Sequence, residues 1–227
     1  MAIYVICHGA WSGGWSWQAV RRRLAAAGHE VFTPSYTGLG ERAHLVGPAV
    51  GLGTHIEDIV SLIEFEDLEG VTLVGHSYGG MVAAGVGDRV PARIRRAIFL
   101  DAFVPADGQS VRDLAAGGPP GDIVDGWLVP PMPAPPDTAG PMLAWGGPRH
   151  RHQPEACFSE PIRLASARPP FARSYIHCTV KTPPDTFKPF ADRLRDDPAW
   201  DFHELATGHS PNMSAPDLLS DLLLAIG

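Results

Sequence analysis

The chain has 227 residues, of which 44% are hydrophobic, so it is long enough to bury the core of one domain. A net charge of -7 and no Lys/Arg run longer than Arg21 to Arg23 argue against partners such as nucleic acid or an anionic membrane. The three cysteines lack metal-ligand spacing, so we expect reduced thiols and no bound metal. The sequence shows no export signal and no apolar stretch of the roughly 18 residues that span a bilayer, so we expect a cytoplasmic protein.

Short apolar runs alternate with helical patterns along the whole chain. This alternation is typical of an α/β protein with a mostly parallel central sheet and helices on both faces, and we expect one domain over residues 1 to 227. The predicted strands are Ile3 to Cys7, Glu30 to Thr33, Val71 to Gly75, Ile94 to Leu100, Ser174 to Cys178 and Trp200 to Leu205. The predicted helices are Trp17 to Ala27, Thr54 to Glu66, Gly79 to Arg89, Asp185 to Arg195 and Pro216 to Ala225, the last with Ser214 as its N-cap.

The segment from Pro105 to Pro170 interrupts the alternation because it is dense in proline and glycine. Composition of this kind also occurs in disordered linkers. Because strand-like segments continue on both sides of it, we predict instead a cap inserted at about residues 105 to 170. Its apolar side chains, Trp127 and Trp145 among them, are expected to line a substrate pocket.

The stretch "VTLVGHSYGGMVAAG", residues 71 to 85, contains a G-x-S-x-G motif from Gly75 to Gly79 between a predicted strand and a predicted helix. This context indicates a nucleophile elbow, a strained turn in which flanking side chains would clash. Ser77 is therefore predicted to project its hydroxyl at the start of a helix, where amide groups favour developing negative charge. An ordinary serine in a tight turn is the alternative that this context disfavours.

A serine hydroxyl is a weak nucleophile, so this interpretation requires a histidine base from elsewhere in the chain. Among ten histidines, His209 in "ELATGHSPNMSAPDLL" follows the last predicted strand, which fits the chain order Ser, acid, His. The chain order is wrong for His8 and His76. His177 and His203 lie inside predicted strands, and His150 and His152 belong to the predicted cap.

The chain resembles a known family over nearly its whole length. Four segments carry this resemblance: "VICHGAWSGGWSWQAV", "GHSYGGMVAAG", "IFLDAFVPADGQS" and "GHSPNMSAPDLL". It resembles the compact α/β-hydrolase group of bacterial carboxylesterases, including pyrethroid-hydrolase-like enzymes, and of plant methyl-ester esterases and hydroxynitrile lyases. The resemblance implies that the amides of Ala10 and Tyr78 form an oxyanion hole, in which one donor is worth ~3 kcal/mol. A plain glycine-rich loop is the alternative. Trp11, in the same loop, is a predicted substrate contact together with Trp127 and Trp145.

The third member of a catalytic triad is where the sequence departs from these relatives. They carry an aspartate shortly after the strand that corresponds to Ser174 to Cys178, whereas here Lys181 occupies that place. A lysine cannot accept the imidazole N–H. Asp101, which ends a predicted strand, is the preferred replacement; Asp185 is the second candidate, and a Ser-His pair without an acid stays open. Lys181 itself is expected to be a solvated loop residue rather than a catalytic one.

These observations predict a serine hydrolase that cleaves a small to medium hydrophobic carboxylic ester through a Ser77 acyl-enzyme, with His209 as base and no cofactor. The expected partner is a small-molecule substrate, whose identity the sequence leaves open, as it does the oligomeric state. A non-hydrolytic enzyme of the same fold, such as a lyase, a cyclase or a ring-rearranging enzyme, is the first alternative. Cyanohydrin cleavage is disfavoured because Ser210 replaces the lysine of hydroxynitrile lyases. A ligand-binding module with degraded catalysis is the second alternative.

Overall fold

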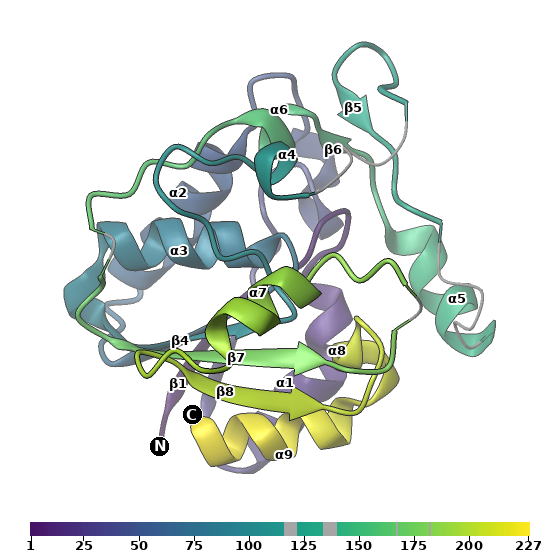
Figure 1. Cartoon of the computed structure of the whole chain (residues 1–227). Coiled ribbons are helices and arrows are strands. Elements are labelled where there is room, and N and C mark those ends of the chain that lie inside the picture. Colours follow the sequence, from purple (N-terminus) through teal and green to yellow (C-terminus); the bar gives the residue numbers. More distant parts are fainter. Residues whose placement is uncertain (116–121, 134–139, 167, 182) are drawn as a thin grey trace.

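A computed structural model describes residues 1–115, 122–133, 140–166, 168–181 and 183–227 (Figure 1). A parallel six-stranded sheet, in the order β2-β1-β3-β4-β7-β8, forms the centre of the molecule. Its strands are β1 (Ile3–Cys7), β2 (Glu30–Phe32), β3 (Val71–His76), β4 (Ile94–Leu100), β7 (Ala172–Cys178) and β8 (Asp201–Leu205). Every residue of β3 is buried, whereas the edge strands β2 and β8 are partly exposed. The predicted α/β architecture is confirmed.

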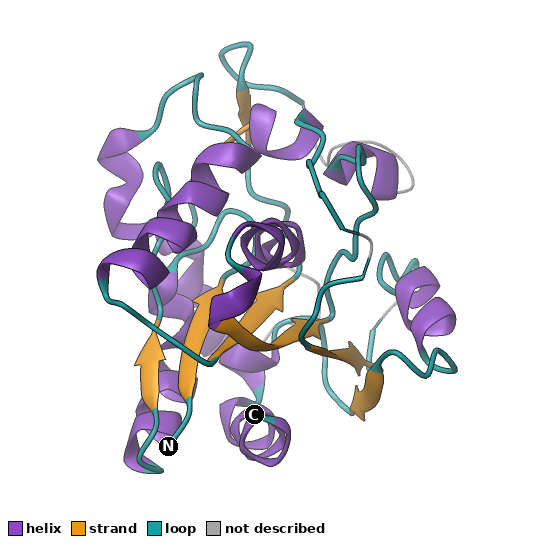
Figure 2. Ribbon diagram, turned by 90° about the vertical axis from the view of Figure 1, so that its left-hand side faces the viewer, coloured by secondary structure: helices purple, strands orange, loops and turns teal. Residues whose placement is uncertain are grey.

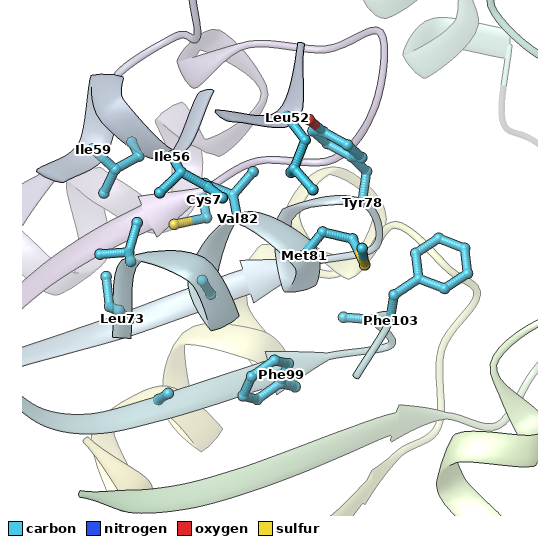
Figure 3. Close-up of a cluster of buried hydrophobic side chains, with 14 of the residues drawn as sticks. Cys7, Leu52, Ile56, Ile59, Leu73, Tyr78, Met81, Val82, Phe99 and Phe103 are labelled. Atoms are coloured by element: carbon cyan, nitrogen blue, oxygen red, sulfur yellow. The ribbon is translucent and has the colours of Figure 1, made fainter. Parts of the chain in front are cut away.

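Helices cover both faces of the sheet, as Figures 1 and 2 show. One face carries α2 (Leu52–Phe65), α3 (Gly79–Arg89) and α7 (Lys188–Leu194), and the other carries α1 (Gln18–Ala26) and α9 (Pro216–Ile226). Each layer buries its own apolar cluster: Ile59, Leu73 and Val82 lie in the first (Figure 3), and Trp17 and Leu219 lie in the second. Short 3-10 helices complete the connections: η1 (Gly14–Trp17), η2 (Gly40–Leu45), η3 (Pro91–Arg93) and η4 (Gly147–Arg149).

The described residues between β4 and β7 form short elements. They are α4 (Val111–Leu114), α5 (Gly140–Gly146), α6 (Ala156–Ser159) and a two-stranded ribbon of β5 (Leu128–Val129) and β6 (Gln153–Pro154). Helix α6 packs against α2 and α4, on the same side of the sheet as α3 (Figure 1). The predicted cap falls in this segment, and its residues 116–121, 134–139 and 167 lie outside the described residues.

The connection from β8 to α9 differs from the prediction. A further short helix, α8 (Pro211–Ser214), lies between them, and Ala215 precedes α9. Ser214 therefore does not cap α9; its hydroxyl donates to the carbonyl of Ser210 at 3.0 Å, within its own helix. Pro216 occupies the first turn of α9, as predicted.

The three cysteines are free and buried, as predicted. Burial raises the pKa of Cys7, Cys157 and Cys178 to about 12 each, so all three are protonated thiols at neutral pH. The described part of the chain holds no cluster of His, Cys, Asp and Glu arranged for a metal ion. None of its described helices combines the length and apolar character that crossing a bilayer requires.

Candidate active site

The carboxyl ends of four neighbouring strands lie in register at one edge of the sheet. The pairs at these ends are Cys7 with Gly75, His76 with Leu100, and Leu100 with Ile176. The residues that follow, Ser77 after β3 and Asp101 after β4, are therefore neighbours. The connections from the adjacent strands β1 and β3 also leave in opposite directions here, to β2 and to β4, and ligands of parallel sheets bind at such a switch point.

Ser77 occupies the turn between β3 and α3. Its φ of 55° lies in the left-handed region that non-glycine residues seldom adopt. The turn is fixed from β4, because the Ser77 amide donates to the carbonyl of Leu100 at 3.3 Å. It also has no room for side chains, since a methyl group at Gly79 would overlap the carbonyl oxygen of Cys7. The strand-turn-helix geometry expected from the motif is thus present.

His209 lies in the loop between β8 and α8, and its ring is held from two sides. Its Nδ1 contacts Oδ2 of Asp101 at 2.6 Å, and Phe187 stacks on the ring with centroids 4.8 Å apart. A nitrogen that faces a carboxylate at this distance carries the proton, so Nε2 is the unprotonated nitrogen of the neutral ring. The arrangement leaves Nε2 available as a base.

Asp101 is completely buried and has a φ of 41°, a second left-handed residue at this edge. Besides His209, its carboxylate accepts from the amide of Cys178 at 3.2 Å and from Nζ of Lys181 at 2.7 and 3.0 Å. Burial alone would raise the pKa of Asp101, but the hydrogen bonds and charges of His209 and Lys181 outweigh it and hold the pKa below its usual value. Asp101 is therefore an ionised acceptor.

Asp185, the second predicted candidate for the acid, does not contact His209. It accepts from Lys181 Nζ at 2.7 Å, from His177 Nε2 at 3.0 Å and from the amide of Phe187 at 2.9 Å. The expectation of a solvated Lys181 is wrong, because its side chain is only 11% exposed and contacts both carboxylates. Nothing in its proline-rich sequence context signals this burial.

His76, the residue before Ser77, links the elbow to the histidine loop. Its Nε2–H donates to the carbonyl of His209 at 2.8 Å, and the two rings lie 4.8 Å apart. Burial lowers the pKa of His76 to about 3, so the ring is a neutral donor at neutral pH. Chain order excluded His76 as the base. Its position inside the G-x-S-x-G motif, directly before Ser77, is the sequence feature that could have predicted its contact with the histidine loop.

Two more neutral histidines support the backbone on either side of Ser77. Tyr78 donates its hydroxyl to Nδ1 of His55 at 2.9 Å, because His55 Nε2–H donates to the Thr37 carbonyl at 3.1 Å. Nε2 of His8 accepts a hydrogen bond from the amide of Tyr36, 3.2 Å away, and the two rings lie tilted against each other with centroids 3.9 Å apart. Burial lowers the pKa of His8 to about 4 and that of His55 to about 3.

The loop after β1 lies directly against the elbow. A Cβ at Gly9 would stand 3.4 Å from Cβ of Ser77 and 3.1 Å from Nδ1 of His76. Ala10, the next residue, and Tyr78 therefore belong to two segments that meet at Ser77. Within the described residues, the Ser77 hydroxyl and the amides of Ala10 and Tyr78 make no hydrogen bond, so they have no competing protein partner.

Trp11 connects this loop to the ribbon. It has a φ of 59°, its amide donates to Oε1 of Gln153 at 2.8 Å, and its Nε1–H donates to the Val129 carbonyl at 3.1 Å. Its ring stacks on Phe158 with centroids 5.5 Å apart. A strained backbone of this kind persists only where neighbouring groups fix it. The ribbon thus holds the conformation of the residue that follows Ala10.

The other two predicted substrate contacts lie in the β4–β7 segment. Trp127 is partly buried, and its carbonyl accepts the amide of Glu155 at 2.8 Å. Trp145 is 39% exposed and packs on Trp15 at 5.2 Å and under the guanidinium of Arg149 at 4.7 Å. These contacts join α5 to the start of η1 rather than to the His209 ring.

The model of the alpha/beta hydrolase family matches residues 4–222. The chain belongs to this family. A carbendazim hydrolyzing esterase from Nocardioides sp. (strain SG-4G) is 36% identical over 242 aligned residues that cover 100% of both chains. Salicylic acid-binding protein 2 from Nicotiana tabacum is 36% identical over 103 residues, 45% of this chain and 40% of that one. The family and the full-length esterase relative make this chain an esterase-type enzyme.

Two solved structures share the fold. An extracellular alpha/beta-hydrolase from a Paenibacillus species has a TM-score of 0.80 and 24% identity, covering 100% of this chain and 99% of that one. A pyrethroid hydrolase from Sphingobium faniae JZ-2 has a TM-score of 0.75 and 18% identity, covering 99% and 96%. The fold expected from the family resemblance is therefore confirmed.

The neutral histidines predict a loss of stability in mild acid. The pKa values of His8, His55 and His76 are lowered in the folded protein. In the unfolded chain these histidines have the ordinary pKa near 6.5, so below that pH the unfolded chain binds more protons than the folded protein. The contribution of these neutral histidines to the free energy of unfolding is therefore complete above about pH 6.5 and is lost as the pH falls toward 4. Each ring contributes a slope on the order of 1 kcal/mol per pH unit. We expect urea unfolding at pH 7, 6 and 5 to show a falling free energy.

A matched pair of variants isolates this effect. His55→Gln removes one buried titrating ring and should flatten the slope, whereas His44→Gln, at an exposed position, should leave it unchanged. An unfolding free energy that stays constant from pH 7 to pH 5 in the wild-type protein would contradict the assignment of neutral buried rings.

Proposed function

We propose that the protein hydrolyses a small to medium hydrophobic carboxylic ester through an acyl-enzyme on Ser77. The observation that carries this proposal is the position of His209, held by Asp101 at 2.6 Å and tied by His76 to the elbow that presents Ser77. The same four groups come from the ends of β3 and β4 and from the loop after β8. This geometry matches the roles of nucleophile, base and orienting acid.

In the first half of the reaction, Ser77 Oγ attacks the ester carbonyl while His209 Nε2 takes the hydroxyl proton. Asp101 keeps the proton on Nδ1 and stabilises the imidazolium that forms. Collapse of the tetrahedral intermediate breaks the bond to the alcohol, which leaves with the proton from Nε2. In the second half a water molecule, deprotonated by His209, releases the carboxylic acid and restores Ser77.

The developing oxyanion needs donors that are in place before the reaction. The amides of Ala10 and Tyr78 supply them in this proposal, because their segments meet at Ser77. The Tyr78 side chain is anchored by His55, and the Ala10 side is held through Trp11 and the ribbon. In a structure without substrate, the contact from base to nucleophile is commonly long and tightens on binding.

The substrate is proposed to be neutral and apolar. Aromatic side chains surround the site: Trp11 stacks on Phe158, Phe158 packs on Tyr78, and Phe187 stacks on His209. The positive charge of Lys181 is already paired with two carboxylates, so Lys181 is not available to bind a phosphate. Trp127 and Trp145 remain proposed contacts for the larger part of the substrate. Because a full-length relative is named for carbendazim hydrolysis, carbendazim belongs in the assay beside short-chain esters.

The non-hydrolytic alternative rested on the absence of an acid at the usual position. Asp101 provides a buried, ionised carboxylate next to His209 from a different strand, so that reasoning no longer favours a lyase or cyclase. The ligand-binding alternative needs an inert site, whereas the Ser77 hydroxyl has no competing partner among the described residues and the His209 ring is oriented by Asp101.

Replacing Ser77 tests the covalent mechanism. Ser77→Ala should lower kcat for p-nitrophenyl butyrate by at least about 10⁴-fold, because the acyl-enzyme forms on the Ser77 hydroxyl. A fluorophosphonate probe should add to the peptide that contains Ser77 in the wild-type protein and not in the variant. Ser159→Ala, which removes a hydroxyl bound only to Glu155, is the control and should keep full activity. Turnover above a few per cent in Ser77→Ala would rule out the acyl-enzyme.

The two carboxylates around Lys181 make a matched comparison for the acid. Asp101→Asn removes the charge that stabilises the imidazolium, so kcat should fall by about 10⁴-fold. Asp185→Asn leaves the contact between Asp101 and His209 in place, so kcat should fall by less than about tenfold. Both variants keep the shape of the side chain, and circular dichroism checks their folding. A larger loss in Asp185→Asn than in Asp101→Asn would reverse the assignment.

A further inference from the structure

Lys181 is a largely buried cation in direct contact with the Asp101 carboxylate of the proposed site. Its three ammonium protons have three acceptor oxygens: Oδ1 and Oδ2 of Asp101 at 2.7 and 3.0 Å, and Oδ1 of Asp185 at 2.7 Å. A buried ammonium is tolerated only when it is paired in this way. The pairing is more than a surface ion pair, because Asp101 has no exposure to solvent.

Lys181 also joins groups that are far apart in the sequence into one continuous path. The path runs from the His209 ring through Asp101, Lys181 and Asp185 to His177, with successive contacts of 2.6, 2.7, 2.7 and 3.0 Å. We call Asp101, Lys181 and Asp185 the ionic array. Burial raises the pKa of each carboxyl, but the contacts with Lys181 and the histidines lower both pKa values overall. The array therefore holds two carboxylates and one ammonium.

We propose that Lys181 is a positioning residue for the ester hydrolysis: its ammonium holds Asp101 toward His209 and offsets part of the charge that the His209 ring faces. The inference rests on the proposed function, because it assigns His209 the role of base. In the wild-type protein the array has a net charge of about -1, and without Lys181 it has about -2 at the same place. The ammonium therefore offsets part of the negative charge that Asp101 and Asp185 place next to the His209 ring.

The charges next to the His209 ring determine the direction in which loss of the Lys181 ammonium changes its protonation. Asp101 contacts the ring from the end of β4, and Lys181, in the loop after β7, links Asp101 to Asp185. His76 from β3 is neutral, and His177 and Cys178 of β7 lie behind the two carboxylates. Removing the ammonium leaves only negative charge in the array, which favours the imidazolium. A change of one nearby charge shifts such a titration by about one pH unit or more.

Lys181→Met removes the charge and keeps an apolar side chain of similar length. The acid limb of the kcat/KM profile for p-nitrophenyl butyrate should move upward by about one pH unit. The His209 ring, followed by NMR of 15N-histidine protein without substrate, should titrate at a correspondingly higher pH. Lys181→Arg, which keeps the charge, should stay close to the wild-type values in both measurements. Lys188→Met, at a lysine whose side chain is 61% exposed and paired with Asp192, should change neither measurement.

The outcomes separate this inference from the proposed function. If Lys181→Met lowers activity equally at every pH and leaves the His209 titration in place, Lys181 is only structural and the inference is wrong. If the NMR shift occurs but the acid limb does not follow it, the coupling stands and the role of His209 as base fails. If Lys181→Met does not fold, Asp185→Asn replaces it: removing a negative charge should move both measurements downward, and an upward or absent shift would overturn the inference.

Discussion

The contact between Asp101 Oδ2 and His209 Nδ1, 2.6 Å long, is the interaction on which the site depends. Asp101 stands at the end of β4 with a left-handed backbone, and its amide donates to the carbonyl of Ile176 in β7 at 2.7 Å. A buried carboxylate is costly unless donors satisfy it. Here the donors come from His209, Lys181 and an amide of β7, so one group ties together β4, β7 and the histidine loop.

Around this pair the site is built from neutral rings with fixed tautomers. His8, His55 and His76 are all buried, and each uses its ring nitrogens to hold backbone or a tyrosine hydroxyl close to Ser77. Charge is concentrated instead on the side of His209 away from the nucleophile, in Asp101 and its ion pairs. In the proposed reaction, this division gives the His209 imidazolium a counter-ion and leaves the oxyanion to the amides of Ala10 and Tyr78.

Sequence reasoning predicted those parts of the proposed site that a local pattern defines. The elbow at Ser77 and the loop of His209 follow from a motif between a strand and a helix and from chain order. The choice between Asp101 and Asp185 stayed open because it depends on the register of β4 and β7, which no local pattern contains. The burial of Lys181 was missed for the same reason, since its two acceptors become neighbours only in the folded sheet. The ribbon has strands of two residues, too short for a periodic signal.

The hydrogen on His209 Nδ1 gives the most direct test of the central claim, because its signal requires no substrate and no assumption about the reaction. In 15N-histidine protein, a proton bonded to His209 Nδ1 and shared with Asp101 should resonate far downfield of the amide signals, and His209→Gln identifies it. We expect Asp101→Asn to remove this signal or move it strongly upfield, and Asp185→Asn to retain it. A wild-type protein with no proton on His209 Nδ1, or a signal that survives Asp101→Asn unchanged, would contradict the account.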